Sequence, residues 1–294
     1  MKREPKQVLS VSRRTDIPAF YMPWFMDRMT RGGIEVVNPF NRQVRQVPVT
    51  PRRVHAIVFW SKDFGPFLAD RCGEQLQAMG YHLLFNFTVN SRSPILEPGV
   101  PGLDQRLDQL RQLCRRFGAA SVRWRFDPIC HFTRTAGIVE SNLNDFETIA
   151  VAAGKCGIDT CITSFMDRYR KIERRTRDRL TFVEPSPVQR EKILLNMEQT
   201  LIPLGIQLAL CCEKKVLDRL PPESTIRAGA CISGRWIMAV HGGLISLRQD
   251  TGQRKAAGCG CTASVDVGSY SLHPCYHSCL FCYANPACDQ RGRQ

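Results

Sequence analysis

Apolar, β-branched stretches alternate along this chain with segments whose apolar residues recur at helical spacing. The first of these strand-like stretches is "VLSVSRR", residues 8–14. Further stretches of the same kind are residues 55–61, 81–89, 121–128, 160–166 and 206–212. Several of the intervening helical segments end at glycine, the residue that most easily takes a left-handed helix cap. Strands that alternate with helices in this way predict βαβ units on a parallel sheet.

Six such units predict an α/β fold, and more specifically a closed or nearly closed (β/α) barrel over residues 1–212. Residues 33–50 predict an extra hairpin after the first helix. The rest of the chain, residues 213–294, predicts a cysteine-rich extension that completes the barrel. In a (β/α) barrel the side chains at the carboxyl ends of the strands share one site.

The residues at these strand ends are unusually polar. They are Arg13, Arg14, Asp16, Asn38, Trp60, Lys62, Asn86, Thr88, Asn90, Arg125, Asp127, Ser164, Asp167, Arg168 and Glu213. A series of six polar strand ends predicts a pocket. The densest groups are Arg13, Arg14 and Asp16 on one strand and Arg125 with Asp127 on another, and these five are the candidate catalytic residues. In "RFDP", the arginine and aspartate either form a structural ion pair or hold an anionic ligand by bidentate contacts.

Charge and cysteine content add to this prediction. The net charge is +14, from 41 Lys and Arg against 27 Asp and Glu, which favours a polyanionic partner such as nucleic acid. The basic run "RYRKIERRTRDR", residues 168–179, is at least as typical of a solvated helix face. No apolar segment reaches the roughly 18 residues that span a bilayer, and no secretory h-region follows "MKREPKQ", so we expect a cytoplasmic protein without a membrane partner. In that reducing compartment, 14 bunched cysteines indicate metal binding or redox chemistry.

The first cysteine set is Cys275, Cys279 and Cys282, in the stretch "HPCYHSCLFCYANP". Zinc sites usually close with four ligands, often as two C-x2-C pairs, and this stretch holds one such pair. Three cysteines on one tight loop favour a [4Fe–4S] cluster whose fourth iron is open to a ligand. Zinc stays an alternative, because Cys288, His273 or His277 could supply a fourth ligand.

This spacing, with the aromatic Phe281 before the third cysteine, resembles the radical S-adenosylmethionine superfamily. "CLFCYAN" is similar in particular to the spore photoproduct lyase branch. The resemblance implies that S-adenosylmethionine binds the open iron, with Phe281 near the cofactor, and that an electron from an external donor cleaves it into methionine and a 5′-deoxyadenosyl radical. Superfamily members usually carry the triad after the first barrel strand. Here it comes last, so we expect a circular permutation in which "SVDVG" pairs in parallel with "VLSVS".

The second cysteine set is Cys212, Cys231, Cys259 and Cys261. Cys212 lies at a strand end, and glycine-rich turns surround the other three, which lets the backbone fold tightly around an inorganic centre. Four thiolates would close either an auxiliary [4Fe–4S] cluster or a structural zinc site. If the strand continues, Cys211 points to the opposite face.

Over nearly its whole length, in stretches such as "SVSRRTDIPAFY", "IVFWSKD" and "VRWRFDPI", the chain resembles the family named domain of unknown function 1848. That resemblance implies a barrel protein with a terminal radical-type cluster motif and names no substrate. The leading hypothesis is a radical S-adenosylmethionine enzyme that acts on an unknown substrate, with nucleic acid one candidate. The alternative is a non-catalytic nucleic-acid-binding protein with structural zinc or iron–sulfur centres.

Overall fold

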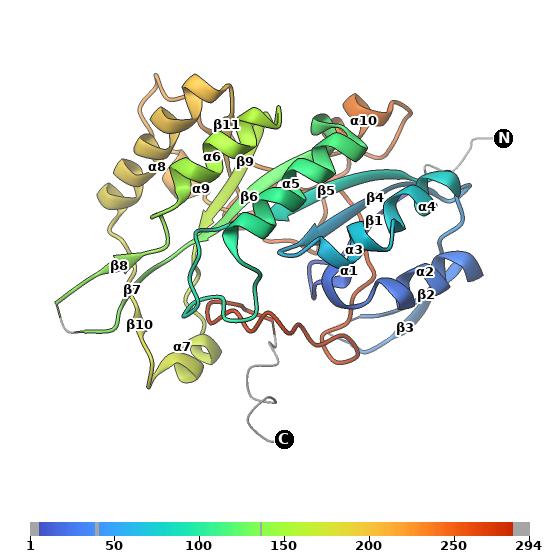
Figure 1. Cartoon of the computed structure of the whole chain (residues 1–294), viewed down its shortest axis with the longest axis horizontal. Helices are drawn as coiled ribbons and strands as arrows, with labels where there is room; N and C mark the ends of the chain where they lie inside the picture. The colour runs from blue at the N-terminus through green and yellow to red at the C-terminus, as the bar shows by residue number, and fades with distance from the viewer. Residues whose placement is uncertain (1–5, 39–40, 136, 285–294) are drawn as a thin grey trace.

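A computed structural model describes residues 6–38, 41–135 and 137–284 (Figure 1). Within these residues, eight strands form one sheet in which every neighbouring pair is parallel. In spatial order the strands are β12 (Arg227–Ala228), β11 (Gln207–Leu210), β9 (Thr160–Phe165), β6 (Val122–Ile129), β5 (His82–Thr88), β4 (Val54–Ser61), β1 (Gln7–Val11) and β13 (Val265–Asp266). All six strands expected from the apolar pattern are present, so the prediction of an α/β fold on a parallel sheet is confirmed.

Helices follow most of the strands, as βαβ connections require. They are α1 (Ile17–Phe20), α2 (Met22–Arg31), α3 (Gly65–Ala69), α4 (Cys72–Ala78), α5 (Leu103–Phe117), α6 (Phe146–Lys155), α7 (Arg170–Thr176), α8 (Pro187–Leu201), α9 (Lys214–Leu217) and α10 (Gly234–His241), with 3₁₀ turns at η1 (Ala119–Ser121), η2 (Ile202–Leu204) and η3 (Lys255–Ala257). None of the helices in the described part of the chain is long and apolar enough to cross a membrane.

Two small antiparallel sheets lie beside the main one. β2 (Gly33–Val37) and β3 (Val44–Pro48) form the expected hairpin, which starts directly after the left-handed Gly32 that ends α2. β10 (Thr181–Phe182), β7 (His131–Thr133) and β8 (Glu140–Ser141) form the other, at the carboxyl end of β6. Helix α7 lies between β9 and β10 in the chain, and Figure 1 shows it below the main sheet.

The two faces of the main sheet differ in what covers them. Residues such as Phe59 and Phe85 point to the face packed by α1 to α6, α8 and α9, where the larger hydrophobic core lies. Their neighbours Val58 and Leu84 point to the other face, because side chains alternate along a strand. There the chain after β11, including Trp236 of α10, forms a second, smaller core. The cysteine-rich extension therefore packs on the sheet rather than hanging from it.

The ends of the sheet are β12 and β13, each two residues long. Among the described residues no hydrogen-bonded pairing joins these two strands, so the sheet has an open order and the closure expected of a barrel is not seen.

The pairing of β13 with β1 confirms the parallel partnership expected for "SVDVG" and "VLSVS". Leu9 lies opposite Val265, and Ser10 lies opposite Asp266. The Asp266 carboxylate accepts hydrogen bonds from the hydroxyls of Ser10 (2.9 Å) and Ser12 (2.6 Å) and from the Arg13 backbone N–H (2.7 Å). One carboxylate thus holds a two-residue strand that the ladder bonds alone would hold weakly.

Replacing Asp266 by Ala should lower the free energy of unfolding by about 3 kcal/mol, because it leaves the Ser10, Ser12 and Arg13 donors without their charged acceptor. Urea unfolding followed by circular dichroism measures this change. The matched control is Asp108→Ala, whose carboxylate lies on the exposed face of α5 and whose loss should leave the free energy of unfolding almost unchanged. Equal small losses in both variants would show that Asp266 does not hold β13.

Candidate functional site

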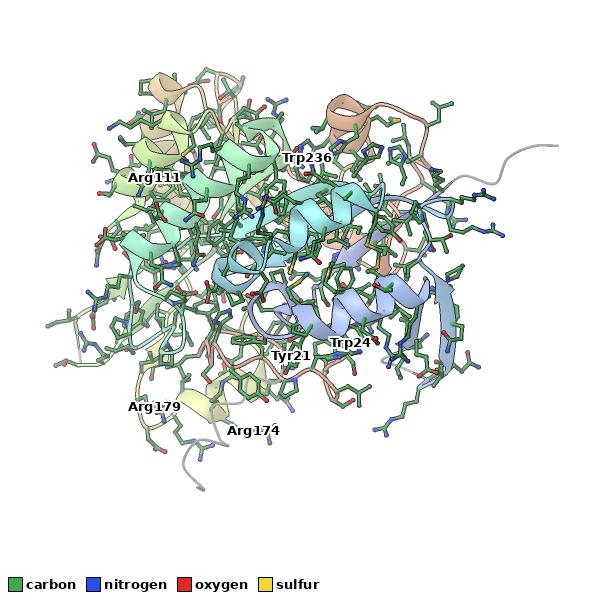
Figure 2. The ribbon with its side chains drawn as sticks, turned by 45° about the vertical axis from the view of Figure 1, so that its right-hand side comes forward. Tyr21, Trp24, Arg111, Arg174, Arg179 and Trp236 are labelled. Carbon is green, nitrogen blue, oxygen red and sulfur yellow. The ribbon has the colours of Figure 1, made fainter. Side chains whose placement is uncertain are left out.

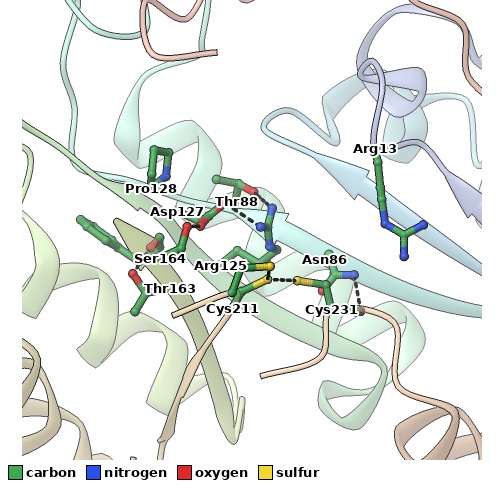
Figure 3. Close-up of polar contacts among 12 residues, drawn as sticks. Arg13, Asn86, Thr88, Arg125, Asp127, Pro128, Thr163, Ser164, Cys211 and Cys231 are labelled. Carbon is green, nitrogen blue, oxygen red and sulfur yellow. Dashed lines mark hydrogen bonds and ion pairs between the residues drawn. The ribbon is translucent and has the colours of Figure 1, made fainter. Parts of the chain in front are cut away.

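Polar side chains gather at the carboxyl end of β6 and its neighbours (Figure 3). Arg125 donates through Nη2 to Asp127 Oδ2 at 2.6 Å and through Nη1 to Thr88 at 3.3 Å. The other Asp127 oxygen accepts from the Ser164 hydroxyl at 2.5 Å. The ion pair expected as one reading of "RFDP" is therefore present, and it links β5, β6 and β9 across their ends.

Arg125 lies between the two cysteine sets. Burial alone would lower its pKa, but the charge of Asp127 and then of Cys231 and Cys211 raises the pKa above its ordinary value. The Tyr283 hydroxyl, in the residue after Cys282, contributes in the same direction. The pKa of Arg125 is thus raised both by thiols of the second set and by Tyr283 at the end of the triad loop.

The three polar residues after β1 point to different places. Arg13 donates to Ser264 at 3.1 Å and faces the second cysteine set. Arg14 donates to the backbone carbonyls of Val37 and Gly268, both at 3.0 Å, which joins the hairpin to the end of β13. Arg13 thus faces the second cysteine set, whereas Arg14 binds two backbone carbonyls and lies 3.8 Å from the Asp266 carboxylate.

Asp16 has a full set of partners of its own. It caps α1 by accepting from the Ala19 N–H at 3.0 Å. It also accepts from the Ser61 hydroxyl at 2.7 Å and the Lys62 N–H at 2.8 Å, and it pairs with His277 at 2.7 Å. The last contact joins the first βα loop to the loop of the cysteine triad.

The triad loop lies across the carboxyl ends of the strands and is held by backbone contacts with the loop after β5. The Leu280 N–H donates to the Leu96 carbonyl at 2.8 Å, and the Gly99 N–H donates to the His277 carbonyl at 2.9 Å. A side chain at Gly99 would bring its Cβ within 2.5 Å of the Tyr276 carbonyl oxygen. Only glycine fits this approach, so Gly99 in "EPGV" allows the loop after β5 to pack closely against the triad loop.

The three thiols of the triad are close enough to affect one another. Burial raises the pKa of Cys275 to about 12, with Asp16 and Cys282 adding to the effect. Burial also raises the pKa of Cys279 and of Cys282, and the charges of Cys282 and Cys275 contribute at Cys279. Without a bound cation, these thiols would therefore stay protonated at neutral pH.

Cationic groups surround the triad and act against that effect. Lys62 pairs with Glu97 at 2.5 Å and lies 5.3 Å from the centre of the Phe281 ring. Its charge lowers the pKa of Cys279. Arg175 of α7 donates to the carbonyls of Leu280 (2.8 Å) and Cys282 (2.7 Å). Phe281 is 8% exposed, so the aromatic residue before the third cysteine packs under the loop beside Lys62.

The two histidines of the loop differ in their partners. Both ring nitrogens of His277 face acceptors, the Gly99 carbonyl and Asp16, so neither offers a lone pair to a metal. The His273 ring packs at a tilt against Trp24, with 4.2 Å between ring centroids, and its Nδ1 has no hydrogen-bond partner among the described residues. Cys288 lies outside the described residues. Within the described ranges, no three His, Cys, Asp or Glu side chains surround a point at the distance that a single metal ion requires.

The second cysteine set is a ring of five thiols rather than the expected four. Cys211 Sγ lies 3.7 Å from Cys212 Sγ and 3.7 Å from Cys231 Sγ. Cys212 in turn contacts Cys259, Cys259 contacts Cys261, and Cys261 contacts Cys231. Each thiol therefore has two thiol neighbours.

The expectation that Cys211 points to the opposite face from Cys212 is wrong. It assumed that the strand continues, but β11 ends at Leu210. Cys212 then has a left-handed backbone with φ of 61°, which breaks the alternation and turns both thiols to the same side.

Four arginines lie against this ring. They are Arg13 beside Cys261, Arg123 and Arg125 beside Cys231, and Arg254 beside Cys212. Burial lowers the pKa of Arg123 to about 10. Hydrogen bonds from the thiols of Cys211 and Cys259 lower the pKa of Cys212 to about 3. The charges of Arg254 and Arg13 also lower the pKa of Cys212 and Cys261, whereas the pKa of Cys211, Cys231 and Cys259 is raised, so the cations favour the thiolate form at two of the five positions.

Several buried polar atoms around the ring have no hydrogen-bond partner within the described residues. Those near the arginines are Arg13 Nη2, Trp60 Nε1, Asn86 Oδ1, Arg123 Nε and Arg125 Nε. Arg13 and Arg125 both lie over the Trp60 indole, at 5.4 Å and 4.9 Å from its centroid. Orphaned donors of this kind are rare in folded proteins and usually mark a place where a bound group supplies the acceptor.

Three of these residues were not among the candidates from the sequence. Arg123 had a usable signal, because it lies two residues before Arg125 and so shares its face of β6. Cys211 was assigned to the wrong face. Arg254 had no local signal, because its place beside Cys212 depends on the path of the loop that contains it.

Comparisons with known proteins identify a family and no activity. No curated protein matches the chain. Among solved structures, D-hydantoinase from a Bacillus sp. AR9 matches 54% of this chain with 10% identity and a TM-score of 0.28, too low to indicate a shared fold. The matched part spans about a third of that protein's length (34%). The model of the family described as domain of unknown function (DUF1848) matches residues 8–284, so the chain belongs to this family.

Proposed function

We propose that the protein is a radical S-adenosylmethionine enzyme whose triad, Cys275, Cys279 and Cys282, holds a [4Fe–4S] cluster with one open iron. The observation that supports this most is the position of the triad loop, which lies across the strand ends with Cys279 buried, Cys275 and Cys282 half-buried, and the three thiols near one another. When bound, such a cluster passes one electron from an external donor to S-adenosylmethionine and yields a 5′-deoxyadenosyl radical. Cysteines that bind different irons need not surround one point, so the lack of a single-ion site fits this proposal.

The protein's own residues prepare the site for an anionic group. Lys62 lies near Cys279 and Arg175 binds the backbone at Cys282, so both offset the charge of the thiolates. His277 shares its two ring protons with Gly99 and Asp16, which fixes the loop to the first βα connection. Packing by Phe281 keeps water from one side of the loop.

The parallel pairing of β13 with β1 supports a circularly permuted barrel. β13 occupies the position beside β1, and the triad follows β13 directly, as it follows the first strand in the superfamily. The permutation places the last strand of the chain, rather than the first, before the cysteines. Residues 213–284 then add β12 and β13 at the two ends of the sheet that residues 7–210 form.

The second set holds an auxiliary [4Fe–4S] cluster under this proposal, with ligands among Cys212, Cys231, Cys259, Cys261 and the neighbouring Cys211. A tetrahedral zinc site requires each of four sulfurs to contact the other three, roughly 3.8 Å apart for Zn–S bonds of about 2.3 Å. The two Sγ–Sγ distances between Cys211 and its neighbours, 3.7 Å each, are close to that spacing. Thiolates bound to different irons of a cluster lie further apart, so structural zinc stays the alternative for this set.

Arg13 and Arg125, with Asp127, are proposed to hold the carboxylate or ribose of S-adenosylmethionine or an anionic part of the substrate. The support is their unpartnered N–H groups over Trp60, between the two cysteine sets. Arg14 and Asp16 contribute indirectly, since their partners are backbone groups and the triad loop.

The iron content tests the two centres. Anaerobically reconstituted protein should contain about eight irons per chain, and the variant with Cys275, Cys279 and Cys282 all replaced by Ala should retain about four. Elemental analysis measures both, and the pair Cys114→Ala and Cys156→Ala, which lies apart on α5 and after α6, should leave the content unchanged. Loss of all iron from the triad variant would show that the sets are not independent. A colourless protein with stoichiometric zinc would favour the non-catalytic nucleic-acid-binding alternative.

Cleavage of S-adenosylmethionine tests whether the triad cluster has an iron open to this ligand. With dithionite and S-adenosylmethionine under anaerobic conditions, the wild-type protein should form 5′-deoxyadenosine, detected by mass spectrometry. The triad variant should fall to the level without protein, because nothing then delivers the electron. Cys156→Ala should match the wild type. Equal product from the triad variant would contradict the proposal.

A further inference from the structure

An exposed basic surface adjoins the triad loop on α7 and the residues around it. Between residues 168 and 179 the chain has seven basic and two acidic side chains. We call the basic rim the set of exposed residues Arg170, Lys171, Arg174, Arg177 and Arg179. Figure 2 shows Arg174 and Arg179 at the edge of the molecule, far from Arg111 of α5.

The basic rim is joined directly to the loop that carries the triad. Arg175, on the same helix, donates to the carbonyls of Leu280 and Cys282 at 2.8 Å and 2.7 Å. A molecule that lies along α7 therefore reaches the triad without crossing another part of the surface.

Within the described residues, the charges of the basic rim have no salt-bridge partner. The acidic Glu173 pairs with Arg168, outside the rim. No carboxylate in the described part of the chain forms a salt bridge with any of the five rim residues. On α5, by contrast, Arg111 pairs with Asp108, which is the pattern of an ordinary solvated helix face. An uncompensated row of cations beside a candidate site favours a polyanion.

Exposed tyrosines lie between the basic rim and the triad. Tyr169, directly before α7, is 37% exposed, and Tyr283, directly after the triad, is 46% exposed. Their ring centroids are 6.4 Å apart. The Tyr283 hydroxyl donates to the Arg13 carbonyl at 2.9 Å, which fixes the orientation of the ring. Tyr276, 37% exposed, lies on the same loop.

Cations that follow a backbone, together with aromatic rings that stack bases, are how proteins bind single-stranded nucleic acid. We propose that a single nucleic-acid strand binds along α7, with its phosphates on the basic rim and its bases on Tyr169 and Tyr283, so that one nucleotide lies at the triad. The proposed strand would be the substrate of the proposed radical enzyme. Binding of the strand does not depend on the radical function; only its reaction at the triad does. A duplex offers no free base faces for the tyrosines.

Fluorescence anisotropy with a labelled 15-residue oligothymidylate tests the strand binding on anaerobically purified full-length protein, without reductant or S-adenosylmethionine. In the wild type the affinity should fall steeply with salt. The double variant Arg174→Ala and Arg177→Ala should reduce the magnitude of the slope of log K against log [salt] by about 1.4, from about 0.7 per phosphate contact. The control is Arg111→Ala with Arg115→Ala, two exposed arginines of α5 that lie a similar distance apart in the sequence, which should leave the slope unchanged.

Tyrosine variants separate stacking from charge. Tyr169→Ala should weaken oligothymidylate binding about tenfold at every salt concentration, whereas Tyr169→Phe should bind like the wild type, because stacking needs the ring and not the hydroxyl. Equal binding by Tyr169→Ala, tighter binding of the matching duplex, or equal losses in the α5 control would each overturn the proposal. The binding assay involves no reaction, so it is independent of the radical function. Strand binding without 5′-deoxyadenosine formation would contradict the radical function alone. Formation of 5′-deoxyadenosine without strand binding would contradict the docking surface alone.

Discussion

The parallel pairing of β13 with β1 is the constraint on which the candidate site depends. Two residues at the end of a long chain add a strand beside the first one, held by the Asp266 carboxylate and its hydroxyl and amide donors. The triad loop follows at once, so it must cross the carboxyl ends of the strands, where Asp16 meets His277. Without that pairing, the cysteines would have no fixed relation to the sheet.

The second theme is the balance of buried charge. The two cysteine sets follow one another in the sequence, and Arg125 lies near Cys231 and Cys211 of the second set and near Tyr283, which follows the triad. Burial of thiols alone favours their neutral form, as the raised pKa of Cys275 shows. Buried guanidinium groups favour thiolates in return, and a metal centre would satisfy both. The unpartnered N–H groups of Arg13 and Arg125 are consistent with a bound acceptor that the protein itself does not provide.

Much of the fold could be predicted from the sequence, because alternating apolar residues in stretches such as residues 81–89 leave little choice but a buried strand. The partnership of "SVDVG" with the first strand was also predictable, from the position of the triad. Sequence reasoning grouped Arg13 with Arg14, although backbone carbonyls turn Arg14 toward the hairpin. It misplaced Cys211, since the left-handed residue that ends the alternation leaves no mark in the local pattern. The closure predicted from the sequence is not seen, because the sheet ends in strands of two residues, which are too short for any periodicity to predict.

The central claim is that one iron at the triad is open to S-adenosylmethionine, and electron paramagnetic resonance tests it most directly. The anaerobically reduced protein should give the signal of a [4Fe–4S]⁺ cluster, and adding S-adenosylmethionine should shift part of that signal while leaving the part from the auxiliary centre unchanged. In the variant that lacks Cys275, Cys279 and Cys282, only the unshifted part should remain. A reduced wild-type spectrum that S-adenosylmethionine does not alter, in protein with a full complement of iron, would contradict the account.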